Sequence, residues 1–256
     1  MPSTPQPHRR RGVAGIVAAV ALIVVACSSV GQATVGPASP TAEATPAPTA
    51  DATAAPTATP VPMATSGPLP ADEATELSPG TYSLASFPVG VSFEVPDGWF
   101  SCSASPVEQS VCYEPPDGAT VIAVAFLIVD NVVADPCSPG EEPLDPPVGP
   151  TVDDLVTAIS NLEGFEATAP LEITVDGFDG KEFTVAAPAD ATCELKTWAT
   201  SNRTNGVGAG EVNVLRILDV EGTRILISGA YHPQDPAPTE RLAALLQVMD
   251  TVRLQP

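Results

Sequence analysis

Residues 212–231 read VNVLRILDVEGTRILISGAY and hold the clearest structural pattern of the chain. Two runs rich in aliphatic and β-branched residues flank the dipeptide Glu221-Gly222, which suits a tight two-residue turn. This pattern predicts an antiparallel hairpin of two long strands, Val212–Val220 and Thr223–Tyr231. In that register Asp219 lies opposite Arg224, and we expect a cross-strand pair worth a few tenths of a kcal/mol.

Strand patterns on the N-terminal side of the hairpin predict a larger sheet. Apolar residues alternate with small or polar ones over Val89–Val95, which indicates a half-buried strand that ends in the turn Pro96-Asp97-Gly98. Trp99 opens the next strand as a core anchor. The unbroken apolar run Val121–Val129 predicts a central strand buried on both faces. Shorter strands are expected at Thr81–Leu84, Val111–Tyr113, Leu171–Val175, Glu182–Ala186 and Glu194–Thr200, with a turn at Asp176–Gly180.

Two segments have helical periodicity. Thr151 and Asp154 nearly form a capping box, so a helix begins there, and Gly164 ends it. A second helix begins near Thr239. Their apolar stripes are Val152, Leu155, Val156, Ile159 and Leu162, and Leu242, Leu245, Leu246, Met249 and Val252. Because strands outnumber helices and most connections are short turns, the sequence predicts an α+β fold, an antiparallel sheet with two amphipathic helices.

Composition divides the chain into three parts. Alanine, threonine, proline and serine dominate from Ser28 to about Pro79. Such a segment cannot bury enough apolar surface to offset its ordering entropy, so residues 27–79 are predicted to be a disordered stalk. Residues 80–256 are predicted to form a single extracytoplasmic domain, long enough for its own core.

The N-terminus has the pattern of a secretory signal. Arg9-Arg10-Arg11 precede the apolar run Gly12–Ala26, which is shorter than the ~20 residues of a spanning helix, so residues 1–26 are predicted to be a signal peptide. The segment Val24-Val25-Ala26-Cys27 resembles the lipobox of bacterial lipoproteins. This resemblance implies a diacylglyceryl group on Cys27 and a chain anchored on the outer face of the cell membrane. An ordinary signal peptide or an uncleaved anchor is the alternative.

Charge narrows the range of partners. Seven basic and 31 acidic residues follow Cys27, which gives the mature chain a net charge near −24. Such a chain repels phosphate backbones, and we expect no nucleic-acid partner. It is also repelled by anionic lipids, so membrane attachment has to come from the lipid on Cys27. Solubility explains the charge, and a surface that binds cations or basic ligands is the alternative.

Four further cysteines, Cys102, Cys112, Cys137 and Cys193, are an even number in an exported domain, which predicts two disulfides. Three pairings are open. We favour Cys102–Cys112, which closes a local strand–turn–strand, and Cys137–Cys193, which fastens a long loop to a strand. A zinc site is the competing interpretation, but the cysteines lack the usual C-x-x-C spacing.

A second resemblance concerns the two ends of the domain. Val91–Trp99 reads VSFEVPDGW and resembles the opening strand and Pro-x-Gly-Trp motif of PsbP-like domains. The final helix, which is expected to end in Asp250–Leu254, is similar to that family's C-terminus. The resemblance implies an antiparallel sheet flanked by helices and a non-enzymatic accessory or assembly role. It carries no catalytic motif.

Residues with chemical potential are few and scattered. His232 has Ser228 and Asp235 nearby in sequence, but no G-x-S-x-G elbow is present, so we expect a surface histidine at a strand end. Asp176, Asp179 and Glu182 do not match the calcium-loop pattern, and a hairpin turn explains them without a metal. Calcium bound by Glu141, Glu142 and Asp145 in their loop is an alternative, but we expect neither a metal nor a cofactor.

These observations together predict a lipid-anchored protein with a non-enzymatic binding or assembly domain and an envelope protein as its partner. The expected binding surfaces are the loops Asp135–Pro150 and Ser201–Gly210, because loops on a rigid sheet carry binding function more often than the sheet itself. A lipoprotein that binds a small molecule or a cation is the first alternative. An envelope hydrolase is the second.

Overall fold

The computed structural model describes residues 65–201 and 203–256. The predicted signal peptide, Cys27 and most of the predicted stalk lie outside these residues. Within the described residues, eight antiparallel strands form a main sheet in the order β4-β5-β6-β14-β13-β10-β8, with β9 also paired to β10. The strands are β4 (Trp99–Ser105), β5 (Glu108–Tyr113), β6 (Ile122–Leu127), β8 (Glu166–Ala167), β9 (Leu171–Val175), β10 (Phe178–Ala186), β13 (Val212–Val220) and β14 (Thr223–Tyr231).

Two smaller sheets and two helices complete the described chain. One sheet has the order β1-β2-β3-β15 and the other β12-β11-β7. These elements are β1 (Thr65–Pro68), β2 (Gly80–Ser83), β3 (Gly90–Val95), β7 (Asn131–Val132), β11 (Leu195–Ala199), β12 (Thr204–Val207), β15 (Arg253–Gln255), α1 (Val152–Ser160) and α2 (Pro238–Met249). The prediction of a mainly antiparallel fold with two helices is confirmed.

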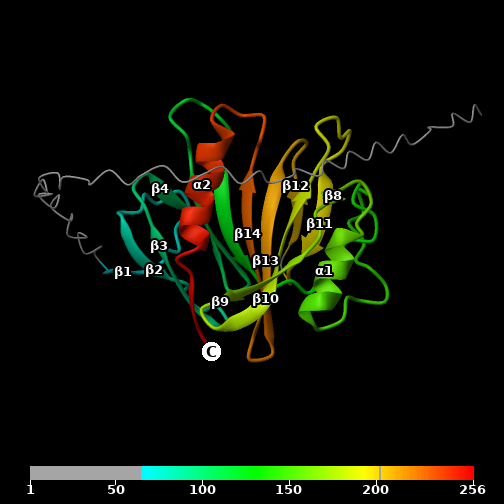
Figure 1. Ribbon diagram of the computed structural model, residues 1–256, viewed down its shortest axis with the longest axis horizontal. Helices are drawn as coiled ribbons and strands as arrows, with labels where there is room; N and C mark the ends of the chain where they lie inside the picture. The colour runs from blue at the N-terminus through cyan, green and yellow to red at the C-terminus, as the bar shows by residue number, and fades with distance from the viewer. Residues whose placement is uncertain (1–64, 202) are drawn as a thin grey trace, which may run out of the picture. The chain divides into compact units, whose positions relative to one another are not determined.

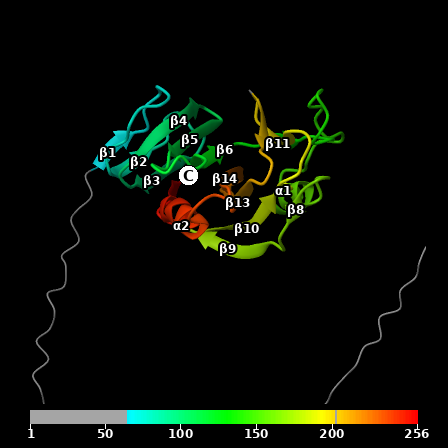
Figure 2. The same ribbon diagram turned by 90° about the horizontal axis from the view of Figure 1, so that it is seen from above.

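The two helices cover opposite faces of the main sheet (Figures 1 and 2). One face packs against α2 and the β1-β2-β3-β15 sheet, where Phe93 stacks on Phe126 with ring centroids 4.7 Å apart. The other face packs against α1 and against Trp198 of β11. Both faces of the central strands are therefore covered, as predicted for the run at Val121–Val129, but the strand itself is shorter, Ile122–Leu127, and Val121 is 39% exposed.

The β13–β14 hairpin has the predicted strands and register, with Asp219 opposite Arg224. The predicted ion pair between these two side chains is wrong. Arg224 donates to the carbonyls of Gly149, Thr151 and Val129, and Asp219 instead accepts a hydrogen bond from the amide of Gly222 at 2.6 Å. Arg224 therefore joins the main sheet to the start of α1 rather than to its neighbouring strand.

The N-terminal boundary of the domain differs from the prediction, since residues 65–79 pack on the sheet. Strand β1 runs parallel to β2, and Leu69 and Leu77 are buried in the core. Backbone hydrogen bonds join the segment to β4, as in Leu77 N–H to Trp99 C=O at 2.8 Å. The amino-acid composition of residues 65–79 did not indicate this boundary, because two leucines account for most of the buried surface of the segment.

Three local predictions are also corrected. The final helix ends at Met249 instead of continuing to Leu254, and the chain then pairs with β3 as strand β15. The loop Ser201–Gly210 contains β12, which pairs with β11. The turn predicted at Asp176–Gly180 is shorter, because β10 already begins at Phe178.

Candidate binding groove

Helix α1 begins where the sequence predicts, at a capping box built with aspartate. The Asp154 amide donates to Thr151 Oγ1 at 3.1 Å, and the Thr151 amide donates to Asp154 Oδ2 at 3.0 Å. The hydroxyl and the amide of Thr151 both hold the pKa of the Asp154 carboxyl below its ordinary value. The shorter aspartate thus reaches the N-cap residue as glutamate usually does.

The loop Asp135–Pro150 is fastened from beneath by Asn131, a side chain that is 9% exposed. Its amide nitrogen donates to the carbonyl of Leu144 at 2.9 Å, and its amide oxygen accepts from Val148 N–H at 3.1 Å. Arg224 holds the end of the same loop through the carbonyls of Gly149 and Thr151. The loop therefore has a fixed conformation, although most of it lacks regular secondary structure.

A second set of contacts fastens this loop to β11. Cys137 and Cys193 form a disulfide with Cα atoms 5.8 Å apart, the pairing favoured from the sequence. The ammonium of Lys196 lies 3.3 Å from Glu141 and 3.2 Å from Glu194. Hydrogen bonds to Glu194 and then Glu141 raise the pKa of Lys196, so this link stays charged over the physiological range.

An open groove of about 530 Å³ lies between this loop and α1. We call it the α1 groove. Most of its lining side chains are apolar or small, and the two acidic ones, Asp154 and Glu163, belong to α1 and the turn after it. The groove is lined by Val132, Val133, Ala134, Leu144, Val148, Gly149, Asp154, Thr157, Ala158, Asn161, Leu162 and Glu163.

The two predicted binding loops have different roles. Asp135–Pro150 supplies one wall of the groove. Ser201–Gly210 lines no part of it; its strand β12 lies on the other side of β11 from β7. Sequence reasoning missed the wall formed by Thr157 and Asn161, which are four residues apart and therefore share one face of α1. The four-residue spacing of Thr157 and Asn161, next to the apolar stripe of the helix, is the sequence feature that could have indicated this wall.

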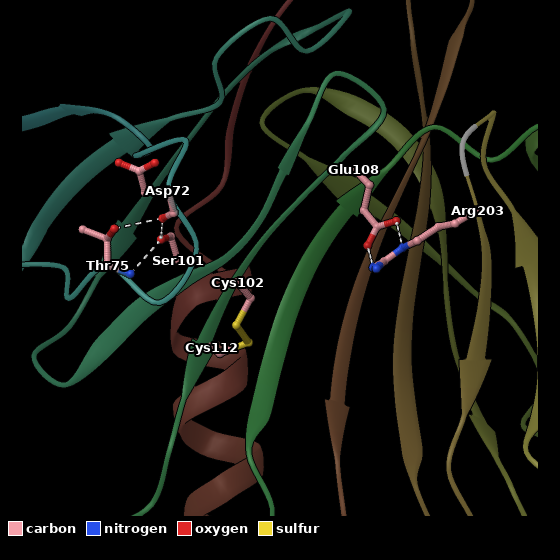
Figure 3. Close-up of a disulfide and its surroundings, with 7 residues drawn as sticks. All are labelled: Asp72, Thr75, Ser101, Cys102, Glu108, Cys112 and Arg203. Carbon is pink, nitrogen blue, oxygen red and sulfur yellow. Dashed lines mark hydrogen bonds and ion pairs between the residues drawn. A yellow bond between two sulfur atoms is a disulfide. The ribbon is translucent and has the colours of Figure 1, made fainter.

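The other disulfide, Cys102–Cys112, joins β4 to β5 with Cα atoms 5.9 Å apart (Figure 3). It is the second pairing favoured from the sequence. Nearby, the buried Glu108 carboxylate accepts two hydrogen bonds from Arg203, one of them at 2.7 Å from Nε (Figure 3). This pair ties the first residue of β5 to the residue that precedes β12.

All seven lysines and arginines of the described residues are already engaged. Six contact carboxylates, and Arg224 contacts backbone carbonyls. The six are Lys181, Lys196, Arg203, Arg216, Arg241 and Arg253. A phosphate or a carboxylate ligand would therefore have to displace an existing contact.

The residues of the hydrolase alternative do not meet in one relay. Ser228 Oγ donates to Asn213 at 2.9 Å, and Asp235 accepts from the amide of Thr120 at 2.8 Å. That backbone hydrogen bond holds the pKa of Asp235 below its ordinary value. His232 Nε2 lies 3.8 Å from a carboxylate oxygen of Glu211. Each of the three side chains thus has a different neighbour.

The carboxylates considered as calcium ligands likewise do not form a metal site, and several of them already have hydrogen-bond or ion-pair partners. Asp176 accepts from the amide of Leu254, Asp179 from the hydroxyl of Thr174, and Glu182 pairs with Arg216. In the other group, Glu141 pairs with Lys196. No group of three or more histidines, cysteines or acids that could hold a metal is found among the described residues.

No protein-family model and no curated protein matches the chain. Among solved structures, it is similar to LpqN of Mycobacterium tuberculosis, whose structure is described as that of a protein involved in cell envelope biogenesis. The sequence identity is 16% and the TM-score 0.36, and the match covers 69% of this chain and 91% of LpqN. A TM-score this low carries no argument about fold or function. The lipobox and PsbP resemblances are not tested by it and stay predictions.

No helix among the described residues is both long enough and apolar enough to cross a membrane.

Proposed function

We propose that this protein is a lipid-anchored, extracytoplasmic binding module without catalytic activity, and that it docks a protein of the cell envelope in the α1 groove. The observation that carries the proposal is a groove of about 530 Å³ with a mostly apolar lining. Both of its walls have a fixed structure. One is the capped helix α1, and the other is the loop held by Asn131, Arg224 and the Cys137–Cys193 disulfide. A preorganised apolar site loses little conformational entropy when a partner binds.

Charge indicates which partner fits. No lysine or arginine lines the groove, whereas Asp154 and Glu163 do. The adjoining loop adds Glu142 and Asp145, and neither forms an ion pair with a lysine or arginine of the described residues. An apolar side chain flanked by basic residues complements this surface, since matched potentials favour encounter and exclude wrong partners. The occupant is therefore an apolar anchor on a basic surface of another envelope protein.

A small apolar molecule is the second candidate for the same groove. Its volume falls within the roughly 300–1,000 Å³ range of small-molecule sites. Such a ligand would stabilise the purified protein by mass action, by an amount that grows with the logarithm of its concentration above the dissociation constant. The two candidates are separated by asking whether a protein or a small molecule accompanies the lipoprotein when it is isolated.

Cross-linking in intact cells, followed by isolation of the full-length protein, tests the function. The diagnostic variant is Thr157→Trp, which places a large ring on the exposed α1 wall of the groove. The matched control is Thr239→Trp on the exposed surface of α2, outside the groove. We expect a stoichiometric protein that is lost with Thr157→Trp and kept with Thr239→Trp.

Each other result counts against the proposal. A partner kept by Thr157→Trp overturns the groove as the docking site. Absence of any partner from the unaltered protein overturns the interaction module, and a co-isolated small molecule then establishes the second candidate. Anchoring is tested separately with Cys27→Ala, which we expect to block lipidation and release the protein from the membrane fraction. Unchanged membrane attachment would contradict the lipobox prediction.

A further inference from the structure

Strand β9 forms a free edge of the main sheet. Within the described residues, β9 is hydrogen-bonded to β10 and to no other strand. Its first residue, Leu171, is 64% exposed, and the other exposed large apolar side chain described, Val121, is 39% exposed. An open edge with an exposed apolar residue is a template for pairing with another extended chain.

Hairpin geometry determines which backbone groups of β9 face outward. The two turn residues have φ angles of 50° and 91°, as a type I′ turn requires, so the flanking pair Val175 and Phe178 is hydrogen-bonded. Hydrogen-bonded and non-hydrogen-bonded pairs alternate along an antiparallel ladder, so Ile173 also bonds to β10. The N–H and C=O groups of Glu172 and Thr174 therefore point away from the sheet.

Acidic hollows lie along the face of β9 that carries Glu172 and Thr174. Two adjoining hollows of about 340 and 290 Å³ are lined by Glu172 and Asp179, and one of them also by Asp153 and Asp219. The single cation there, Lys181, is held by Asp153 at 2.7 Å and Glu172 at 3.1 Å. Negative charge thus exceeds positive charge on this face.

The opposite face of β9 borders a hollow that apolar and charged residues line together. Side chains alternate between the faces of a strand, so Ile173 and Val175 lie on the side away from Glu172. They contribute with Met249 and Val252 to a hollow of about 290 Å³, in which Arg216 is already paired with two carboxylates. An added strand would place alternate side chains on the acidic face and on the face that carries Ile173 and Val175.

We propose that β9 binds an extended segment of a partner protein as an added strand, with basic side chains over Glu172 and Asp179 and apolar side chains over Ile173 and Val175. Backbone hydrogen bonds to Glu172 and Thr174 supply affinity, and the hollows on the two faces supply specificity. This surface is separate from the α1 groove and goes beyond the proposed function.

Charge excludes a second copy of this chain as the intended occupant. Pairing β9 with another β9 would bring two sets of the acidic residues Glu172 and Asp179 together, and like charges across a sheet are destabilising. The mature chain as a whole has a net charge near −24. A basic, amphipathic strand has the complementary pattern.

A blocked heptapeptide of alternating lysine and valine is the probe, and the full-length protein in neutral detergent is the receptor. Thr174→Pro removes an outward N–H without breaking the β10 ladder, and Thr174→Val is the control that keeps this N–H. We expect Thr174→Pro to weaken peptide binding by about tenfold or more, and Thr174→Val to change it by less than about twofold. Thr157→Trp in the α1 groove leaves binding of the peptide unchanged.

Modified peptides keep the proposal falsifiable if Thr174→Pro destabilises the fold. N-methylation of the valine amides removes the donors of the added strand, and a glutamate-for-lysine version reverses its charge. We expect both to abolish binding. The proposal is overturned if the lysine–valine peptide fails to bind, if either modified peptide binds equally well, or if the protein forms dimers that Thr174→Pro disperses. None of these results bears on the partner tested with Thr157→Trp.

Discussion

Among single residues, the buried carboxylate of Glu108 shows how this acidic domain uses its few cations. Its side chain is 3% exposed, whereas Arg203, which binds it with two donors, is 55% exposed. A carboxylate taken out of water needs compensating hydrogen bonds, and here the guanidinium provides them. The cation therefore stabilises the fold by compensating this buried charge.

Arg203→Ala should lower the free energy of unfolding by about 2 kcal/mol, because it leaves a buried charge without its partner. Glu108→Gln combined with Arg203→Ala should recover part of this loss, since the remaining amide carries no charge. Urea unfolding of the two variants and the unaltered protein measures both effects. Equal stability of the single and double variants would contradict this role for the pair.

Asp154 is the residue at which pH should act on α1. Its pKa in the folded protein is below its ordinary value of 3.8 because Thr151 donates to the carboxylate. The ionised form is thus favoured by folding, so its contribution is present above about pH 4 and is lost as the pH falls through the lowered pKa. Asp154→Asn should flatten the stability profile below pH 4 relative to Asp153→Asn, as measured by thermal unfolding. Identical acid profiles for the two variants would show that the capping box has no such effect.

Among the structural elements, those specified by residues close in sequence could be predicted, and those that depend on distant strands could not. The β13–β14 hairpin and α1 carry their own turn and cap, so residues close in sequence specify them. Strand β15 depends on β3, and the Glu94 amide bonds to Thr251, 157 residues away. The same reason applies to the α1 groove. The sequence indicates the loop Asp135–Pro150 as a binding surface, but it does not indicate that this loop packs beside α1.

Loss of the Cys137–Cys193 disulfide should affect the fold more than loss of Cys102–Cys112. The two bonds span 56 and 10 residues of sequence, so the chain-entropy account gives contributions of about 4 and 3 kcal/mol. Paired Cys→Ser variants compared by urea unfolding measure the difference. Only the variant without Cys137–Cys193 should also lose the partner of the α1 groove, because that bond holds one groove wall. Loss of the partner in both variants would instead indicate general unfolding.

For the whole molecule, the boundary between linker and domain determines how the predicted lipid anchor would be joined to the fold. Residues 65–79 belong to the domain, and Leu77 is 4% exposed in the same core as Trp99. Leu77→Ala should therefore destabilise the protein by about 2–4 kcal/mol, as for other buried leucines. Leu171→Ala, at a position that is 64% exposed, is the matched control and should change stability by less than about 0.5 kcal/mol. Urea unfolding of both variants tests this, and a small effect of Leu77→Ala would return these residues to the linker. A large effect means that β1 and the segment after it join the linker to the core itself, so that the two proposed binding surfaces lie on a folded body that begins directly after the linker.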